Sequence, residues 1–267
     1  MTIEIIKKEL PELSVIIPFH GEKKYLEKCL EGMLNQKSGL KYEIIVVESE
    51  NKNDIKDLAC SYPNIIFISS DTLLYPGRAR NLGVNKSNSE FLAFIDADCI
   101  PETDWASNIF SSLNDGYDIV LGPILNLYPA HPIASVDNLL VFPDFQKSHP
   151  SKSFIHFPPC NLGITKKLFI ESGGFPEEIK IGEDTKFSRS VLRKCNPKII
   201  YNNKIIVRHS GRKNFVQFMK HQQSFGYNRG YSDSKKNIAG SELKKNFLYS
   251  FFYGCRRRSY IFIRTLQ

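Results

Sequence analysis

Long apolar runs, paired cysteines and low-complexity tracts are all missing from this 267-residue sequence. No stretch reaches the roughly 18 consecutive apolar residues of a membrane-spanning helix. The charged start MTIEIIKKELPE also lacks the apolar core of a signal peptide. The six cysteines include no CxxC pair, which argues against a zinc site or a disulfide framework and favours reduced, mostly buried thiols. These absences predict a cytoplasmic globular protein without redox chemistry.

Acidic residues are scarce in the last third of the chain. Residues 186–267 hold 19 Lys and Arg but only 2 Asp and Glu, whereas residues 1–185 hold 17 against 26. Such a basic region can bind nucleic acid, an anionic membrane or phosphorylated substrates. We recognise no nucleic-acid-binding module and expect no such partner. Residues 243–264 mix aromatics with Lys and Arg, which fits a segment lying in an anionic membrane surface or an amphipathic helix packed on the rest of the chain.

Apolar runs rich in Ile, Val and Phe alternate with helical patterns through the first half. The runs predict strands at 12–20, 42–48, 64–69 and 90–96. A stripe at helical spacing from Tyr25 to Leu34 predicts one helix, and residues 77–87 are predicted to form another. This order is typical of an α/β fold in which helices flank both faces of a mostly parallel sheet.

Two aspartates, Asp96 and Asp98, end the fourth apolar run with one residue between them. In an extended chain, residues i and i+2 point the same way, so both carboxylates can face one small cavity. A divalent cation such as Mn2+ or Mg2+ would relieve their repulsion and bridge them to substrate phosphates. A solvated loop, in which Asp is common, is the alternative interpretation.

Two further predicted strands end in polar residues. The first ends in Pro18-Phe19-His20-Gly21-Glu22 and the second in Glu48-Ser49-Glu50-Asn51. Ligands of open parallel sheets bind beyond the carboxyl ends of the strands. Turn residues and helix caps would explain each segment separately. Because all three ends share one edge of the predicted sheet, we interpret them together as a ligand site.

The sequence resembles the family-2 glycosyltransferases, an inverting group with the GT-A fold. Five stretches carry the resemblance, in family order between residues 13 and 222: SVIIPFHGEKKYLEKCLEGMLNQ, YEIIVVESEN, YPGRARNLGVNKSNSEFLAFIDADCIP, CNLGITKKLFIESGGFPEEIKIGEDTKFSRSVLRK and VRHSGRKNFVQFMKHQ. Each motif is weak alone, and the five in sequence are specific.

The resemblance implies roles for the strand-end residues. Asp96 and Asp98 would be the DxD pair, with Asp98 the closer ligand of Mn2+ or Mg2+. Glu48 would contact the base or ribose, and Arg80 would lie near the acidic rim. The full set implied to bind the nucleotide sugar is Pro18, Phe19, Glu22, Glu48, Arg80, Asp96 and Ala97.

The chain departs from the family pattern after the second strand. Many members read Asp-Asp-Gly-Ser where this chain reads Glu48-Ser49-Glu50-Asn51, which leaves the nucleotide open, with a UDP-sugar as the expected donor. The Gln-x-x-Arg-Trp segment of processive synthases is also missing, since the only tryptophan is Trp105. We therefore expect transfer of one sugar to a hydroxyl acceptor, for example a lipid-linked saccharide.

The stretch GGFPEEIKIGED ends in Glu183 and Asp184. Inversion needs a base on the opposite face of the sugar to take the acceptor proton, and a carboxylate suits that task. We interpret Asp184 as this base and group Glu183 with it as catalytic. Both acids also suit the N-terminus of a helix, which is the alternative role.

His209 is a candidate third metal ligand, since a histidine has this role in some relatives. A packed or surface histidine is the commoner case. Four basic residues lie near enough in sequence to help hold a diphosphate: Arg208, Arg212, Lys213 and Arg229.

These features predict three parts: a nucleotide-sugar-binding half (1–125), an acceptor-binding and catalytic half (126–212) and a basic helical extension (213–267). The expected activity is metal-dependent, inverting sugar transfer in cell-surface polysaccharide, glycolipid or glycoprotein synthesis, at the cytoplasmic face of the membrane. A haloacid-dehalogenase-like phosphatase and a non-catalytic nucleotide-sugar-binding protein remain alternatives.

Overall fold

The structure is a computed structural model that describes residues 10–50, 55–147 and 154–234, with the backbone alone for 227–234. The strands in chain order are β1 (Leu13–Phe19), β2 (Tyr42–Ser49), β3 (Ile66–Ser70), β4 (Phe91–Phe94), β5 (Cys99–Pro101), β6 (Ile119–Leu121), β7 (Ile124–Asn126), β8 (Leu162–Thr165), β9 (Ile199–Tyr201) and β10 (Val207–His209). The helices are α1 (Lys23–Leu34), α2 (Lys56–Ser61), α3 (Pro76–Lys86), α4 (Trp105–Asn114), α5 (Pro132–Val141), the 3-10 turn η1 (Pro159–Asn161), α6 (Lys166–Ser172), α7 (Glu183–Lys194) and α8 (Phe215–Ser234).

The chain divides into two compact units that interleave along the sequence. Unit 1 comprises residues 1–123, 152–179 and 183–207, and unit 2 comprises 124–151, 180–182 and 208–267. The predicted break after residue 125 falls close to the first of these boundaries. The three-part functional division itself stays a prediction.

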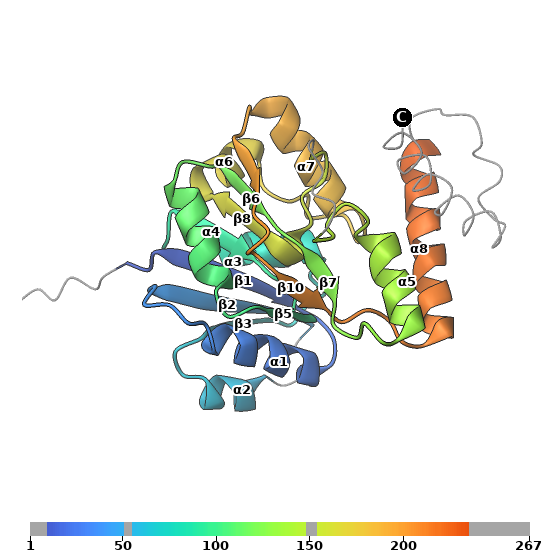
Figure 1. Cartoon of the computed structure of the whole chain (residues 1–267), viewed down its shortest axis with the longest axis horizontal. Coiled ribbons are helices and arrows are strands. Elements are labelled where there is room, and N and C mark those ends of the chain that lie inside the picture. The colour runs from blue at the N-terminus through green and yellow to red at the C-terminus, as the bar shows by residue number, and fades with distance from the viewer. Residues whose placement is uncertain (1–9, 51–54, 148–153, 235–267) are drawn as a thin grey trace, which may run out of the picture. The chain divides into compact units, whose positions relative to one another are not determined.

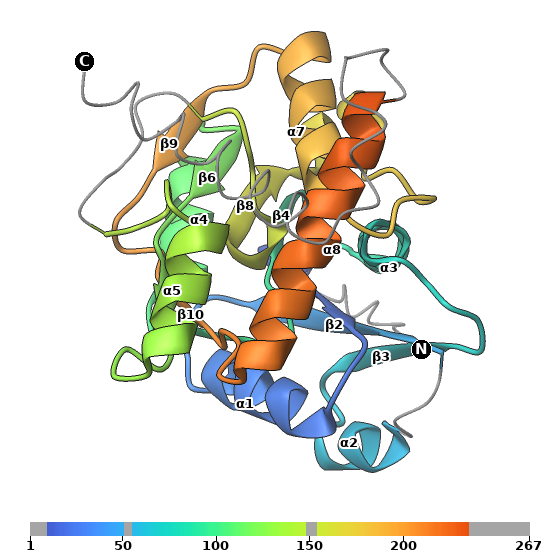
Figure 2. The same ribbon diagram turned by 90° about the vertical axis from the view of Figure 1, so that its right-hand side faces the viewer.

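Unit 1 contains a seven-stranded sheet in the order β3-β2-β1-β4-β8-β6-β9. Its first four strands are parallel, β8 runs antiparallel to both β4 and β6, and β9 is parallel to β6. Figure 2 shows α1 and α2 on one side of β2 and β3 and α3 on the other. The predicted mostly parallel sheet with helices on both faces is confirmed.

Amphipathic spacing explains α1, which buries Leu26, Cys29, Leu30 and Met33. The predicted stripe reaches one residue too far, because Leu34 at its end is 50% exposed. On the opposite face, α3 lies close to the sheet because Gly83 has no side chain: a Cβ there would lie 2.6 Å from Ile16 Cγ2.

Phenylalanines fill the space between β4, α6 and α7. The rings of Phe175 and Phe187 lie 4.3 Å apart, and Phe94 packs edge-on against Phe175 at 5.5 Å. Phe169 from α6 contacts all three. Aromatic pairs of this kind add about 0.5–1.5 kcal/mol each beyond the area they bury. The cluster fixes the first turns of α7 relative to the end of β4.

Two predicted strands need correction. The run at 90–96 is a strand only over Phe91–Phe94, and the run at 64–69 is a strand over Ile66–Ser70. After Phe94 the chain bends, and the Cys99 N–H donates to the Asp96 carbonyl at 2.9 Å. Asp96 and Asp98 therefore lie on a turn, where Asp is favoured at the first position, and not side by side on an extended strand.

Unit 2 is organised around the buried carboxylate of Asp137 on α5. It accepts hydrogen bonds from the Arg212 N–H and Nη1, both at 3.1 Å, and from Gln222 of α8 at 3.4 Å. His221 Nδ1 lies 3.7 Å from the same carboxylate. Burial raises the pKa of Asp137, but hydrogen bonding to His221 and Arg212 outweighs this and lowers it. The ionised Asp137 thus holds α8 against α5, which lie side by side in Figure 1.

Among the helices that the structure describes, none has both the length and the apolar composition required to cross a bilayer.

We expect Gly77→Ala to destabilise the protein by about 1–3 kcal/mol, as overpacking does elsewhere. Gly77 lies in the first turn of α3, and a Cβ there would lie 2.5 Å from the Pro176 carbonyl oxygen. Gly39→Ala is the matched control, since no atom lies within 4 Å of its Cβ position. Urea unfolding of both variants gives the comparison, and equal midpoints would contradict the close packing.

Candidate functional site

The carboxyl ends of β1, β2 and β4 meet at one edge of the sheet, as predicted. Phe19 at the end of β1 lies in register with Glu48 at the end of β2. Ile95, just after β4, donates its N–H to the Ile16 carbonyl on β1. Side chains predicted to bind the nucleotide sugar therefore share this edge within unit 1.

Glu48 is fully buried at this edge, and Ser69 Oγ donates a hydrogen bond to its Oε2 at 2.7 Å. Phe19 is 2% exposed, whereas Pro18 is only partly buried. Glu22, which precedes α1, points into solvent with a side chain that is 65% exposed and pairs with Lys24. The predicted nucleotide contacts thus divide into buried residues that shape the strand ends and exposed residues around them.

Glu50 has a positive φ of 68°. Residues other than Gly rarely adopt this left-handed backbone conformation. Many members of the family that the sequence resembles have Gly at the position of Glu50, in the segment Asp-Asp-Gly-Ser. The chain therefore keeps a glycine-like backbone at the end of β2 without the glycine. The Leu74 N–H donates a hydrogen bond to Ser49 Oγ at 2.8 Å, and the Glu50 N–H donates to the Thr72 carbonyl at 3.3 Å, which hold the main chain in this conformation.

Arg80 on α3 connects two parts of the predicted site. Its Nη2 donates to Asp96 Oδ1 at 2.6 Å and its Nη1 donates to Glu183 Oε1 at 2.9 Å. The Arg80 side chain is only 4% exposed, and its guanidinium lies 5.4 Å from the centre of the Phe175 ring. Arg80 thus lies at the acidic rim, where it was expected, and ties the turn after β4 to the first residue of α7.

The pKa values of this cluster reflect burial in competition with charge. Burial lowers the pKa of Arg80, but Asp96 and Glu183 outweigh it and raise the pKa above the usual value. Burial also raises the pKa of Glu183, and Asp184 adds to this, while Arg80 opposes it. Glu183 therefore depends on Arg80 to stay ionised in its buried position.

Asp96, Ala97 and Asp98 occupy the turn and are all partly exposed. Within the described ranges, no three His, Cys, Asp or Glu side chains are grouped to hold a metal ion. Oxygen donors at the tip of a strand still suit Mg2+ or Mn2+, because these ions commonly take one or two carboxylates and complete their shell with substrate phosphates and water. The residues present therefore fit a metal ion whose shell a phosphate ligand would complete.

Asp184 lies in the first turn of α7 and not at the N-cap position, because the helix begins at Glu183. Its Oδ1 accepts the Thr185 N–H at 2.6 Å, and its Oδ2 lies 2.7 Å from His156 Nε2. Burial raises the pKa of Asp184, but attraction to and hydrogen bonding with His156 outweigh it and leave the pKa below the ordinary value. Asp184 is therefore ionised at neutral pH and able to accept a proton.

Sequence reasoning missed His156. It lies in the irregular segment before η1, 28 residues ahead of its partner Asp184, and no spacing pattern connects the two. The only signal was the density of aromatics and prolines around it, in FIHFPP. Sequence reasoning also missed the contact between Arg80 and Glu183, which are 103 residues apart.

His209 belongs to unit 2, where its ring packs edge-on against Phe142 at 5.1 Å. Its role as a metal ligand stays a prediction. Of the basic residues expected near a diphosphate, Arg212 binds Asp137 and Lys213 Nζ lies 4.0 Å from the centre of the Tyr128 ring. The Arg229 side chain and residues 243–264 lie outside the described residues.

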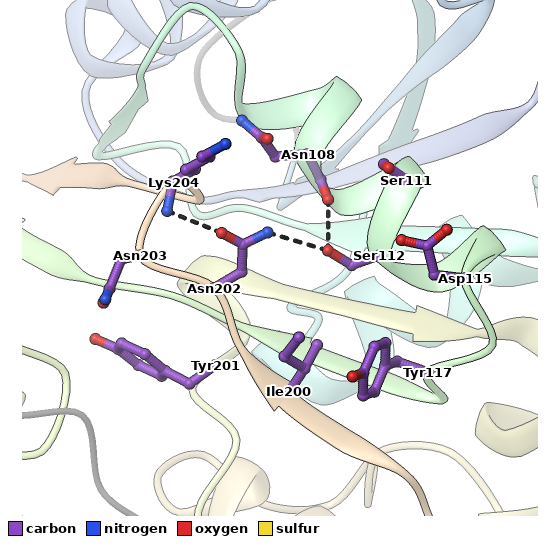
Figure 3. Close-up of a pocket in the computed structure, with 10 residues that line it drawn as sticks. All are labelled: Asn108, Ser111, Ser112, Asp115, Tyr117, Ile200, Tyr201, Asn202, Asn203 and Lys204. Atoms are coloured by element: carbon purple, nitrogen blue, oxygen red, sulfur yellow. Dashed lines mark hydrogen bonds between the residues drawn. The ribbon is translucent and has the colours of Figure 1, made fainter.

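A pocket of about 390 Å³ lies elsewhere in unit 1, between α4 and the end of β9 (Figure 3). Its polar groups bond to one another: Asn202 Nδ2 donates to Ser112 Oγ at 3.1 Å, and Ser112 Oγ donates to the Asn108 carbonyl at 2.8 Å. None of the predicted site residues lines it. The pocket is thus distinct from the strand-end site, which lies at the turn after β4.

The N-terminal part of the chain is similar to a known family. Residues 14–133, which include β1, β4 and the Asp96–Asp98 turn, match the model described as Glycosyl transferase family 2. The matched segment includes Arg80 but ends before His156, Glu183 and Asp184. The match favours the glycosyltransferase interpretation over the phosphatase.

The chain is similar to curated glycosyltransferases and to solved structures. Glycosyltransferase AglE of Haloferax volcanii is 29% identical over 193 residues, which is 67% of this chain and 61% of that protein. The chain thus spans less than two thirds of the length of this relative.

Among solved structures, S. aureus TarS 1-349 in complex with UDP-GlcNAc has a TM-score of 0.61 at 17% identity, covering 90% of this chain and 71% of that one. The mannosyltransferase PcManGT from Pyrobaculum calidifontis, in complex with GDP-Man and Mn2+, has a TM-score of 0.63 at 16% identity, covering 92% and 70%. These likenesses confirm the predicted GT-A fold.

We expect Arg80→Met to destabilise the protein by roughly 3 kcal/mol, because it leaves the buried Glu183 carboxylate without a counter-charge. The deficit should grow as pH rises, since the uncompensated Glu183 must then ionise in a buried position. Arg78→Met is the matched control two residues away: its Nε lies 3.7 Å from Glu177 and its side chain is 54% exposed. That surface pair should contribute less than about 1 kcal/mol. Unfolding free energies are measured with urea at two pH values. Equal losses of stability in both variants would contradict the buried ion pair of Arg80 and Glu183.

Proposed function

We propose that this protein is a metal-dependent, inverting glycosyltransferase that moves one sugar from a nucleoside diphosphate sugar to a hydroxyl acceptor. The observation that carries the proposal is the double contact of Arg80 with Asp96 and Glu183. This contact links the strand-end turn, where a diphosphate would bind, to the helix that presents Asp184. Sugar transfer needs groups that bind the leaving diphosphate and a group that removes a proton. Both sets of groups would lie in unit 1.

The donor side rests on the ends of β1, β2 and β4. Phe19 and Glu48 would shape the base and ribose site, and the turn at Asp96–Asp98 would face the diphosphate. TarS and PcManGT, which share the fold, are described with UDP-GlcNAc and GDP-Man. We infer a nucleoside diphosphate sugar as the donor here, with UDP as the expected nucleotide.

The metal would be Mn2+ or Mg2+, held by Asp98 with help from Asp96. When bound, such an ion stabilises negative charge on the leaving diphosphate. Arg80 has a complementary role. Its hydrogen bond to Asp96 compensates the charge of that carboxylate beside the diphosphate. We assign His209 as a further candidate ligand, and the exposed Glu22 as a peripheral nucleotide contact.

Asp184 would act as the general base. The proton of the acceptor hydroxyl passes to its carboxylate as the acceptor oxygen bonds to the anomeric carbon. The bond from that carbon to the diphosphate breaks on the opposite side, which inverts the configuration. We assign Glu183 to holding Arg80 rather than to proton transfer, since its carboxylate is buried and already binds the guanidinium.

The proposed acceptor is a hydroxyl group at a membrane surface. A hydroxyl of a lipid-linked saccharide fits an enzyme whose C-terminal third is strongly basic, because anionic lipid attracts basic segments. The product would then contribute to cell-surface polysaccharide, glycolipid or glycoprotein at the cytoplasmic face of the membrane.

We expect Asp184→Asn to lower sugar transfer about 100- to 10,000-fold while donor binding stays nearly intact, because the amide cannot accept the proton. Asp104→Asn, on the exposed residue before α4, is the control and should transfer at the normal rate. Transfer from the preferred donor is measured by release of nucleoside diphosphate, and donor binding by calorimetry. Near-normal turnover by Asp184→Asn would exclude the base role.

One nucleotide sugar from a panel should stabilise the protein against thermal unfolding in the presence of Mn2+. Saturation to about 100 times Kd would add roughly 2.7 kcal/mol to the free energy of unfolding. Asp98→Asn should remove both this shift and its metal dependence, since the variant keeps the size of the side chain and loses the charge. Diphosphate affinity that is equal with and without metal, in the wild type and the variant alike, would reject the metal site.

A further inference from the structure

The contact between His156 and Asp184 is suited to control of the proposed base. His156 Nε2 lies 2.7 Å from Asp184 Oδ2, and the two side chains are 32% and 27% exposed. The pair is therefore accessible enough for a substrate and for solvent protons, yet close enough for a strong hydrogen bond.

Contacts on both sides of His156 hold it in place. Two residues earlier, Phe154 stacks on Tyr201 with ring centres 5.5 Å apart and planes 6° from parallel; Tyr201 stands at one end of the pocket in Figure 3. One residue later, the Phe157 N–H donates to Ser188 Oγ at 2.8 Å, and that hydroxyl donates to the Asp184 carbonyl at 2.7 Å. The segment 154–157 is thereby attached to α7 and to β9, and His156 is presented to Asp184 from a defined backbone position.

Each oxygen of the Asp184 carboxylate has a donor. Thr185 N–H bonds Oδ1, and His156 bonds Oδ2. A carboxylate oxygen can accept more than one hydrogen bond, so Oδ2 can still receive an acceptor hydroxyl. The two donors fix the plane of the carboxylate, which a single contact would leave free to rotate.

We propose that His156 is a positioning residue for Asp184, which orients the carboxylate toward the acceptor. The inference rests on the proposed function of Asp184 as the general base. In the transfer step His156 keeps its own proton: the acceptor proton goes to Asp184, and the diphosphate leaves with the bonding electron pair.

The neighbouring charged groups are engaged elsewhere. Arg80 on α3 binds Glu183 on α7 and Asp96 after β4. Among the described contacts, His156 is therefore the side chain that binds Asp184 Oδ2.

The test compares His156→Gln with His156→Ala through kcat and KM. Gln retains an N–H donor, so its kcat should stay within a few-fold of the wild type. Ala loses the donor, so its kcat should fall at least tenfold while KM for the donor is unchanged. An Ala variant with wild-type kcat, or a Gln variant that loses as much activity as the Ala variant, would overturn the proposal.

Two further measurements separate this inference from the proposed function. His131→Gln, at a histidine just before α5 in unit 2, should keep the wild-type kcat. NMR signals of the imidazole protons, with His156 assigned by their loss in His156→Gln, need no substrate. In Asp184→Asn the His156 signals should shift, because the hydrogen-bond partner has changed. Unshifted signals would refute the pairing even if Asp184 proves to be the base, whereas near-normal turnover by Asp184→Asn would refute the base role whatever the NMR signals show.

Discussion

A single buried guanidinium organises the proposed active site. Arg80 is held between Asp96, which follows the central strand β4, and Glu183, which begins α7. Removing a charge from water is costly, and a buried arginine is stable only where its donors meet carboxylates in good geometry. The helix that carries Asp184 is therefore placed by the same contact that fixes the turn at Asp96. The phenylalanine cluster beneath it supplies the rigid packing on which this geometry depends.

Much of the donor side could be predicted from sequence, because local patterns encode it. Apolar runs gave the parallel strands, and strand ends in an open sheet share an edge. Asp96 and Asp98 were predicted as site residues for this reason, although β4 ends earlier and the pair lies on a turn. The rest depends on contacts between distant residues: His156 meets Asp184 through an irregular segment, and Arg80 meets Glu183 from another helix. No periodicity records such pairings, so a single sequence could not reveal them.

Glu50 adopts a backbone conformation that suits glycine better than glutamate. With its positive φ, Glu50 has the backbone conformation that Gly adopts most easily. The sequence departure at the end of β2 therefore changes side chains at the site more than the path of the main chain. A change in nucleotide preference, with the strand end left in place, is the kind of variation that this arrangement permits.

The interleaving of unit 1 bears on how the protein is made. Its three stretches contribute Arg80, His156 and Asp184 in turn, so the ribosome delivers the pieces of the site at separate moments. Arg80 emerges 103 residues before Glu183, an interval of about 5 to 20 s at usual elongation rates. During that interval the nascent α3 has a strand surface to pack on but no carboxylate on α7 for its guanidinium. The contact between Arg80 and α7, and with it the closure of the site, is therefore a late event of biosynthesis.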